Sequence, residues 1–430
     1  MALPSQYHWH RTNAPVASSR TDDVFFIDPN VGWAVNSNGQ VLKTTDGGGH
    51  WDQQLRLPNA YLRCIGFANA QTGWFGTLTA NQLLWSTKDG GAAWKQVTNI
   101  PAVPNAICGL SVVSESIIYA SGTNYPNRPA GVIKTVDGGQ SWTPIDMRNY
   151  ANLLVDIFFK DALHGWVVGG KADVPNPSRD DVHAVVLYTA DGGKSWIDTI
   201  ANLTPTLPKG EWGWKIFFVN DSIGYVSLEN FSAGAILKTT DGGQSWTRHV
   251  VNDPQHNANL EGVGFVDEDH GWVGGWGTPD FSGGYSSETR DGGDDWTDAN
   301  NIGRFLNRFR FFHQPKLVGY ASGDTVYKYD DTAPGALFAA AAATKAVPAI
   351  TRPVKIPYSI AAGGRNLRID VWDRFGEHVA HVLEEANPSA GAGTASWDGK
   401  TDAGTEAPAG FYIYRVSTAQ GAESRIIRIL

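Results

Sequence analysis

Five acidic residues of this chain are candidates for the chemistry of general acids and bases. They are Asp180, Asp181, Glu211, Glu261 and Asp280. Two carboxyl groups are what most glycosidases use, one to donate a proton and the other to attack or to activate water. A polysaccharide lyase needs a similar set to abstract a proton. These five residues are therefore our candidates for catalysis, if the protein is an enzyme.

Aromatic residues near these carboxylates favour a binding site instead. The chain has 17 tryptophans, and Trp212, Trp214 and Trp276 occupy positions that no repeat requires. A flat apolar ring suits the face of a sugar or the side chain of a protein partner, although ordinary packing explains such residues equally well. We add His183 and His256, which lie in long segments beside them, to the candidate ligand-binding residues.

Charged residues also align between repeats. The alignment places Asp22, Arg63, Val155, Trp214, Glu261 and Arg308 in one column, with one residue per repeat. We expect this column at the mouth of a central channel. There it can hold an anionic ligand, carry out acid–base chemistry, or pair its own charges in a wet channel.

The sequence predicts neither a metal centre nor a cofactor. It has no His-x-x-x-His pair and no cluster of cysteines, and no glycine-rich loop leads into a helix. Asp180, Asp181 and His183 include metal-ligand types, but a solvated loop explains them better. The two cysteines, Cys64 and Cys108, are expected as buried free thiols, and a disulfide between them stays open.

A repeated eight-residue motif organises the structure that is expected to position all of these residues. It reads TTDGGGHW at residues 44–51 and returns five times, 43 to 54 residues apart. Its aspartate accepts hydrogen bonds from the following backbone, its two glycines tolerate positive φ, and its tryptophan covers the resulting hairpin. These structural aspartates are Asp46, Asp89, Asp137, Asp191, Asp241 and Asp291. A repeat of this length with four short apolar runs is typical of a β-propeller blade.

The motif resembles the Asp-box, or bacterial neuraminidase repeat, hairpin. Six blades carry it, and residues 305–329 supply three strands of a seventh blade that lacks its fourth strand. Residues 7–11 resemble that missing strand, so we expect an N-terminal strand to close a seven-bladed propeller at residues 1–331. Long loops in blades 4 to 6 then form a raised rim that carries the candidate residues.

The sequence pattern changes after the propeller. Residues 332–353 read as a linker, and residues 354–430 alternate like the strands of a small β-sandwich. The stretch SWDGK at 396–400 and the run PAGFYIYR at 408–415 resemble the Ig-like domain of flagellar hook-capping proteins and the sorting domains of exported bacterial proteins. This resemblance implies an exported protein whose leader is absent from the sequence.

Composition limits the classes of partner. The net charge of −9 argues against nucleic acid, and no apolar run is long enough to span a membrane. We expect a monomer that binds a protein partner or a polysaccharide.

The repeat also resembles the photosystem II assembly-factor type of propeller and its bacterial relatives, through GWAV at 32–35 and KTTDGG at 43–48. That resemblance implies protein binding without catalysis. Sialidases are less similar because they have six blades and an Arg-Ile-Pro motif that is absent here, and xyloglucanases build their cleft between two propellers. The sequence therefore favours an exported, non-catalytic binding or assembly propeller with its protein or glycan site on blades 4–6. An extracellular glycoside hydrolase or polysaccharide lyase using the same face is the alternative.

Overall fold

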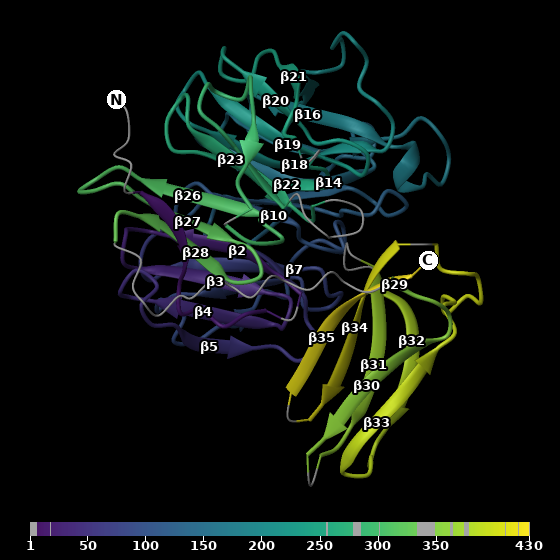
Figure 1. Cartoon of the computed structure of the whole chain (residues 1–430). Helices are drawn as coiled ribbons and strands as arrows, with labels where there is room; N and C mark the ends of the chain where they lie inside the picture. The colour runs from purple at the N-terminus through teal and green to yellow at the C-terminus, as the bar shows by residue number, and fades with distance from the viewer. Residues whose placement is uncertain are drawn as a thin grey trace.

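The computed structural model describes residues 7–17, 19–254, 257–277, 285–300, 302–332, 349–361, 364–373, 378–408, 410–419 and 421–429. Over these residues the protein is almost entirely β-structure, with one 3-10 turn, η1 (Arg179–Asp181). A ring of small sheets is joined to a group of longer strands from the C-terminal part of the chain (Figure 1).

The ring contains seven antiparallel sheets of four strands among the described residues. Blades 1 to 4 are β2 (Thr21–Phe26), β3 (Gly32–Asn36), β4 (Gln40–Thr44), β5 (Asp52–Arg56); β6 (Leu62–Phe67), β7 (Gly73–Thr77), β8 (Leu84–Thr87), β9 (Lys95–Gln96); β10 (Gly109–Val112), β11 (Ile118–Gly122), β12 (Gly131–Thr135), β13 (Thr143–Asp146); and β14 (Leu153–Phe159), β15 (Gly165–Lys171), β16 (His183–Thr189), β17 (Ile197–Asp198). Blades 5 to 7 are β18 (Glu211–Phe218), β19 (Gly224–Asn230), β20 (Ala235–Thr239), β21 (Thr247–Val250); β22 (Leu260–Phe265), β23 (Gly271–Gly275), β24 (Ser286–Thr289), β25 (Thr297–Asp298); and β26 (Arg308–Phe312), β27 (Val318–Ser322), β28 (Val326–Asp330), β1 (His8–Arg11). The predicted seven-bladed fold is confirmed.

The N-terminal strand closes the ring as the sequence predicts. Strand β1 pairs antiparallel with β28, with Trp9 opposite Tyr329. Trp9 is 7% exposed and its ring lies against Trp272, Phe309 and Tyr329. Because the last blade takes its outer strand from the start of the chain, hydrogen bonds join the two ends of the propeller and leave no open seam.

Each Asp-box hairpin is held by its own side chains. In blade 1, Thr44 Oγ1 donates to Asp46 Oδ1 at 2.9 Å, and the same carboxylate oxygen accepts from the backbone of His50 at 2.9 Å. Gly47 and Gly48 have φ of 69° and 93°, which residues with a side chain rarely adopt. The local hydrogen bonds and the two glycines together fix the turn between the third and fourth strands.

Neighbouring blades are joined through one aromatic position on the second strand. In blade 1, the ring of Trp33 stacks on Phe67 of blade 2 with centroids 3.6 Å apart, and its Nε1 donates to the carbonyl of Gly90 in the next Asp-box at 3.2 Å. Tyr320 of blade 7 makes the same two contacts with blade 1, to Phe26 and to Gly47. The recurring Trp or Tyr is therefore a contact between blades.

The C-terminal domain consists of one five-stranded and one two-stranded sheet in the described residues. Its strands are β29 (Ala349–Ile350), β30 (Val354–Ile360), β31 (Leu367–Asp373), β32 (His378–Glu385), β33 (Gly391–Trp397), β34 (Gly410–Thr418) and β35 (Gly421–Ile429). Strand β29 runs parallel to β35, so this domain begins inside the segment that the sequence assigned to the linker. The central strand β34 lies between β35 and β31.

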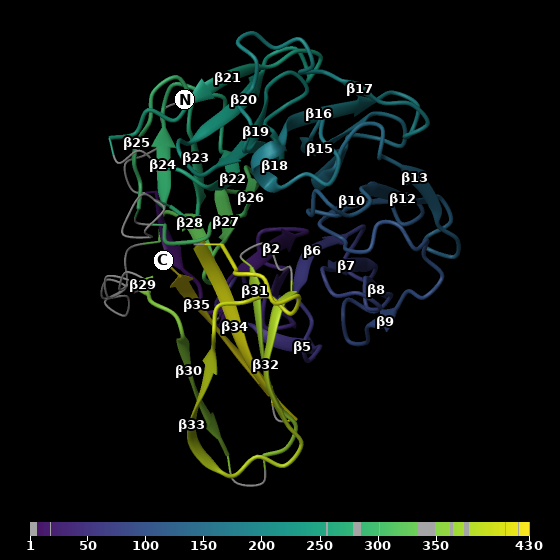
Figure 2. The same ribbon diagram turned by 90° about the vertical axis from the view of Figure 1, so that its right-hand side faces the viewer.

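The C-terminal domain rests on the propeller through alternate residues of β34. Tyr412 and Tyr414 lie in the core of the domain itself. Ile413 packs with Tyr61, Trp276 and Phe305 of the propeller. Strands β31 and β34 approach the ring near β2 and β6 in a view turned by 90° (Figure 2). The domain therefore covers part of the propeller face that carries the loops between second and third strands and between blades; we call this face the loop face.

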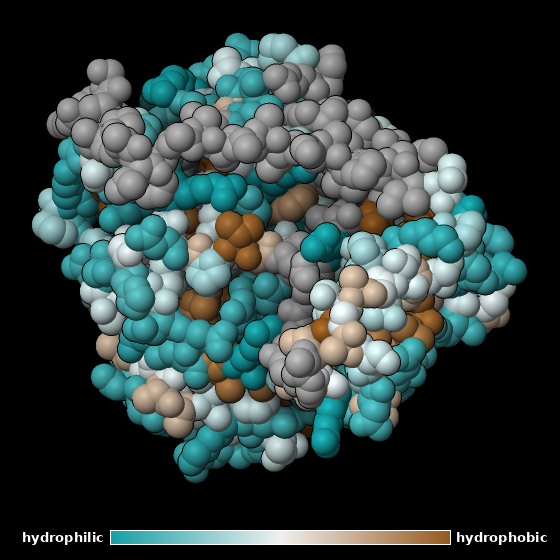
Figure 3. All heavy atoms as spheres, turned by 60° about the horizontal axis from the view of Figure 1, so that its bottom comes forward, coloured by the Kyte–Doolittle hydropathy of each residue, from teal (hydrophilic) through white to brown (hydrophobic). Residues whose placement is uncertain are grey.

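One face of the molecule can be described by its hydropathy. On the face shown in Figure 3, hydrophobic residues form small separate areas within a mainly hydrophilic surface.

Cys64 and Cys108 are both buried and free. No helix in the described segments is long and apolar enough to cross a bilayer.

Candidate functional site

The charged column predicted from the sequence is a buried network of ion pairs. Asp22 Oδ1 accepts from Nε of Arg20 at 2.9 Å and from Nη1 of Arg63 at 2.6 Å. Arg20 also pairs with Glu261, whose second oxygen accepts from Nε1 of Trp276 at 2.8 Å. The side chains of Arg20, Asp22, Arg63 and Glu261 are at most 2% exposed. Within the column, Asp22 and Arg63 pair with each other, whereas Glu261 pairs with Arg20, which the alignment did not place in the column.

A second part of the network crosses the ring. Arg308 donates hydrogen bonds from Nη1 and Nη2 to Asp156, at 3.0 and 2.8 Å. Its Nε donates a hydrogen bond to Asp23 at 3.1 Å. Burial alone would lower the pKa of Arg308, but the charges of Asp156 and Asp23 raise it above the ordinary value. Lys215 lies 4.0 Å from Asp156, and burial lowers the pKa of this lysine to about 8. The ion pairs connect blades 1, 4, 5 and 7 through the centre of the ring.

The exposed rim expected on blades 4 to 6 is wrong for three of its residues, Glu211, Trp212 and Trp276, and Trp214 of the predicted column is buried with them. Glu211, Trp212, Trp214 and Trp276 have no exposed surface. Glu211, at the start of β18, accepts hydrogen bonds from Nε and Nη2 of Arg248 at 2.8 and 2.7 Å. The charge of this carboxylate is therefore balanced by an arginine. Glu211, Trp212 and Trp214 belong to strand β18 and Trp276 directly follows β23, and the three rings pack in the interior instead of facing solvent.

Other candidate residues remain on the surface or lie outside the described residues. Asp180 is exposed and Asp181 is partly exposed on η1, where Asp181 accepts from the backbone and hydroxyl of Ser178 at 2.9 and 2.7 Å. His183 is partly exposed at the start of β16. Asp280 and His256 lie outside the described residues. The described residues contain no group of three or more His, Cys, Asp or Glu side chains arranged to hold a metal ion.

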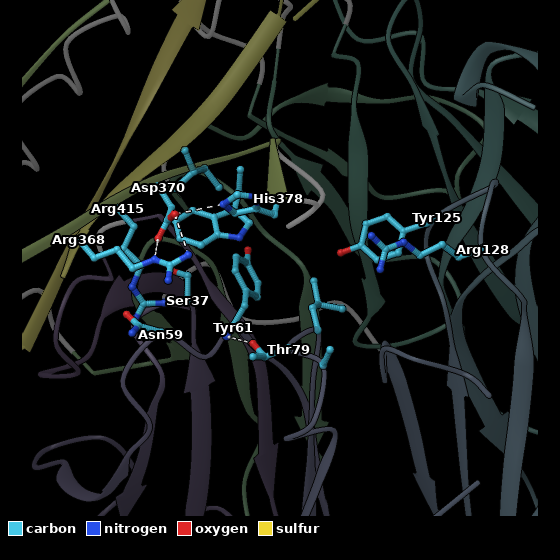
Figure 4. Close-up of a pocket in the computed structure, with 14 residues that line it drawn as sticks. Ser37, Asn59, Tyr61, Thr79, Tyr125, Arg128, Arg368, Asp370, His378 and Arg415 are labelled. Carbon is cyan, nitrogen blue, oxygen red and sulfur yellow. Dashed lines mark hydrogen bonds and ion pairs between the residues drawn. The ribbon is translucent and has the colours of Figure 1, made fainter. Parts of the chain in front are cut away.

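A cleft between the two domains opens on the loop face. Its volume is about 370 Å³. Figure 4 shows Arg368, Asp370, His378 and Arg415 on the side of the C-terminal domain, with Tyr61 and Thr79 of blade 2 near them and Tyr125 and Arg128 of blade 3 across the open space. Ligand pockets of small molecules and peptide side chains begin at about 300 Å³, so the cleft is large enough to hold a residue of a partner.

The charged side chains of the cleft differ in the ion pairs and hydrogen bonds that they make. Asp370 accepts from Arg368 at 2.6 Å and contacts the ring nitrogens of His378 and His381 at 3.2 and 2.8 Å. These partners hold the pKa of Asp370 well below its ordinary value, against the opposing effect of burial, which is the largest single influence. Arg415, opposite Asp370 in the strand register, donates Nη1 to the carbonyl of Ala60 at 3.3 Å.

The sequence reasoning missed this cleft because it treated the two domains separately. One signal was present: β34 places Arg415 two residues after Ile413 in a strand whose alternate positions are tyrosines of the domain core. An arginine and an isoleucine on the second face of such a strand indicate that this face is covered by another part of the molecule. The pairing of that face with the loops of blades 1 to 3 could not be read from the sequence.

Family comparisons match both halves of this architecture. The model described as "Photosynthesis system II assembly factor YCF48" matches residues 2–144, and the model of the FlgD Ig-like domain matches residues 349–422. The photosystem II assembly lipoprotein Ycf48 of Synechococcus sp. (strain CC9902) is 37% identical over 127 residues, which is 28% of this chain and 35% of that protein. The chain thus matches about a third of the length of this relative.

Solved structures extend the likeness of fold to the whole ring. A structure of YCF48 bound to D1 peptide has a TM-score of 0.52 at 16% identity, and covers 76% of this chain and 98% of its own. YCF48 from Cyanidioschyzon merolae has a TM-score of 0.55 at 18% identity, with 75% and 98% coverage. At these identities the likeness shows the fold alone. The chain therefore combines a seven-bladed propeller, whose residues 2–144 are similar to photosystem II assembly factors of the Ycf48 type, with a C-terminal domain similar to the Ig-like domain of FlgD.

Proposed function

We propose that this protein is an exported, non-catalytic binding or assembly protein that holds a polypeptide partner on the loop face of its propeller. The observation that carries the proposal is the cleft of about 370 Å³, in which loops of blades 2 and 3 and strands of the C-terminal domain present polar and aromatic side chains to one space. Sites of this kind, between domains and with a few charged groups, bind ligands in many proteins.

The state of the carboxylates supports binding over hydrolysis. Glycoside cleavage needs two carboxyl groups that reach the substrate. Glu211 is held by Arg248, and Glu261 by Arg20 and Trp276, and both are fully buried. A substrate would have to displace an arginine in either case before it could meet the acid.

The relatives support a polypeptide as the partner. The similar structure titled "YCF48 bound to D1 peptide" contains a peptide complex of the same propeller fold. The curated relative is a lipoprotein by name, which supports an exported location for the present chain. The C-terminal domain adds a second wall to the loop face, so the two domains together provide the binding surface.

Peptide display tests the proposal directly. The purified full chain, immobilised, is panned against a library of random displayed peptides. We expect enrichment of related sequences that bind in solution with a Kd of about 1–100 μM, in the range of transient recognition. The same preparation is incubated with a panel of polysaccharides and assayed for reducing ends and unsaturated products. Turnover on any polysaccharide, together with no enrichment of peptides, would overturn the proposal.

Cell fractionation tests the location. An antibody against the C-terminal domain should detect the protein outside the cytoplasm or at the cell surface. Detection only with cytoplasmic markers would contradict the exported location and leave the binding function to the display experiment.

A further inference from the structure

Arg415 is a buried arginine that has no carboxylate ion-pair partner among the residues that the structure describes. Its side chain lines the cleft, the residue is 4% exposed, and its only described hydrogen bond is the one from Nη1 to the carbonyl of Ala60. Within the described part of the chain, its Nε and Nη2 atoms have no hydrogen-bond partner. Buried donors without partners are rare and costly in proteins, so this arginine has capacity to bind a further acceptor.

Comparison with another buried arginine indicates that an anion is the kind of acceptor that suits Arg415. For Arg308, the charges of Asp156 and Asp23 more than offset burial, and the pKa is raised. For Arg415, burial lowers the pKa to about 10; nearby Arg56 adds to this effect, and Asp370 offsets only part of it. Asp370 is already engaged by Arg368 and two histidines. Arg415 remains protonated at neutral pH, so its charge is buried and unpaired.

Other donors line the same cleft. Tyr61 lines it from the propeller side, and its buried hydroxyl has no hydrogen-bond partner among the described residues. Arg128 lies on the far side, with its guanidinium 4.9 Å from the ring of Tyr125. The lining includes three arginines and one aspartate, which is a net charge of +2 in a chain whose total charge is −9. The local potential in the cleft is therefore opposite in sign to the charge of the molecule as a whole.

We propose that the cleft receives a carboxylate of a bound polypeptide, with Nη2 of Arg415 and the hydroxyl of Tyr61 donating to it. This inference rests on the proposed polypeptide-binding function and specifies its chemistry. A planar carboxylate accepts from an arginine and a second donor at the same time, and such charge-assisted bonds are stronger than neutral ones. The carboxylate comes from the end of a chain or from an Asp or Glu side chain. The recognition site needs both domains, because each supplies one donor.

Three peptide pools distinguish the sources. All are N-acetylated decapeptides of random sequence: the first has no acidic residue and ends in a free carboxylate, the second is the same but amidated, and the third is amidated and carries one Glu. Retention of each pool on the immobilised full chain is measured by mass spectrometry. We expect the first or the third pool to be retained at least about tenfold more than the second, which is the step that one charge-assisted bond contributes. Retention of the first alone identifies a chain end, and retention of the third identifies a side chain.

Two variants and a matched control test the assigned donors. Tyr61→Phe removes only the hydroxyl and keeps the ring that packs with Ile413 and Trp276. Arg415→Gln removes the charge. We expect each to reduce the retention of the carboxylate pool by about fivefold or more. Arg148→Gln is the control, because Arg148 is exposed and paired with Asp146 in a turn away from the cleft.

Each outcome decides the inference. Equal retention of the neutral amidated pool, no retention of any pool, or wild-type retention by both Tyr61→Phe and Arg415→Gln would overturn it. In those cases, peptides enriched by display would still support the proposed function, so the two failures can be told apart. Tyr61→Phe should melt at the wild-type temperature, which separates a lost donor from a lost fold.

Discussion

At the scale of single residues, the centre of the propeller consists of charges that neutralise one another. Arg20, Asp22, Arg63 and Glu261 form one cluster, and Arg308, Asp23 and Asp156 form another. Burying a charge is costly unless it is paired and hydrogen-bonded. The acids and arginines of the channel are therefore parts of the scaffold, whereas the buried charge of Arg415 is the one we assign to recognition.

Removing one partner from the channel network should destabilise the fold. Glu261→Gln leaves Arg20 with Asp22 as its remaining ion-pair partner, and we expect the free energy of unfolding to fall by about 3 kcal/mol, measured by urea denaturation. Glu268→Gln, in the same blade at an exposed position, is the control and should change it by less than about 0.5 kcal/mol. Equal stability of the two variants would mean that the pair contributes little to folding.

At the scale of elements, the Asp-box hairpin was predictable because its causes are local. Its Thr, Asp and two Gly act within eight residues, and the observed hydrogen bonds and positive φ values follow from those residue types. The position of Trp9 opposite Tyr329 was predictable as well, since only one blade lacked its outer strand. The burial of Glu211 and Trp276 was not, because it depends on contacts with distant residues such as Arg248 and Phe305.

The Asp-box aspartates should give the hairpins a measurable pH dependence. Hydrogen bonds from Ser141, and then from Thr135, lower the pKa of Asp137 from 3.8 to about 2. Because the folded pKa is depressed, the stabilising effect is present above about pH 4 and is lost as pH falls through about 2.

Asp137→Ala tests this dependence. At pH 7 we expect the melting temperature to fall by about 2–4 °C, because several hydrogen bonds to the hairpin are lost. The difference from wild type should shrink when the melts are repeated between pH 4 and 2. A difference that stays constant or grows on acidification would show that ionisation of Asp137 does not stabilise the hairpin.

At the scale of the whole molecule, two long-range contacts define the architecture. Strand β1 joins the ends of the ring, and β34 attaches the C-terminal domain to the loop face. The first could be inferred from a missing strand. The second could not, because a strand that is buried on both faces does not reveal what covers its second face.

Closure of the ring can be measured through Trp9. Trp9→Ala removes a buried ring that packs on Trp272, Phe309 and Tyr329, and we expect a loss of about 3–5 kcal/mol in the free energy of unfolding. Ile197→Ala, at a side chain that is 66% exposed, is the control and should have little effect. A similar small loss for both variants would contradict closure through β1.

Photo-cross-linking of a retained peptide tests the central claim that both domains build the binding site. A peptide from the retained pool, with a photoreactive group next to its carboxylate, is irradiated on the full chain and the cross-linked residues are mapped by mass spectrometry. We predict cross-links within residues 59–61 and 78–80 of the propeller and 413–415 of the C-terminal domain, and their loss when unlabelled peptide is in excess. Cross-links confined to the Asp-box hairpins on the opposite face, such as residues 44–51, would contradict the account.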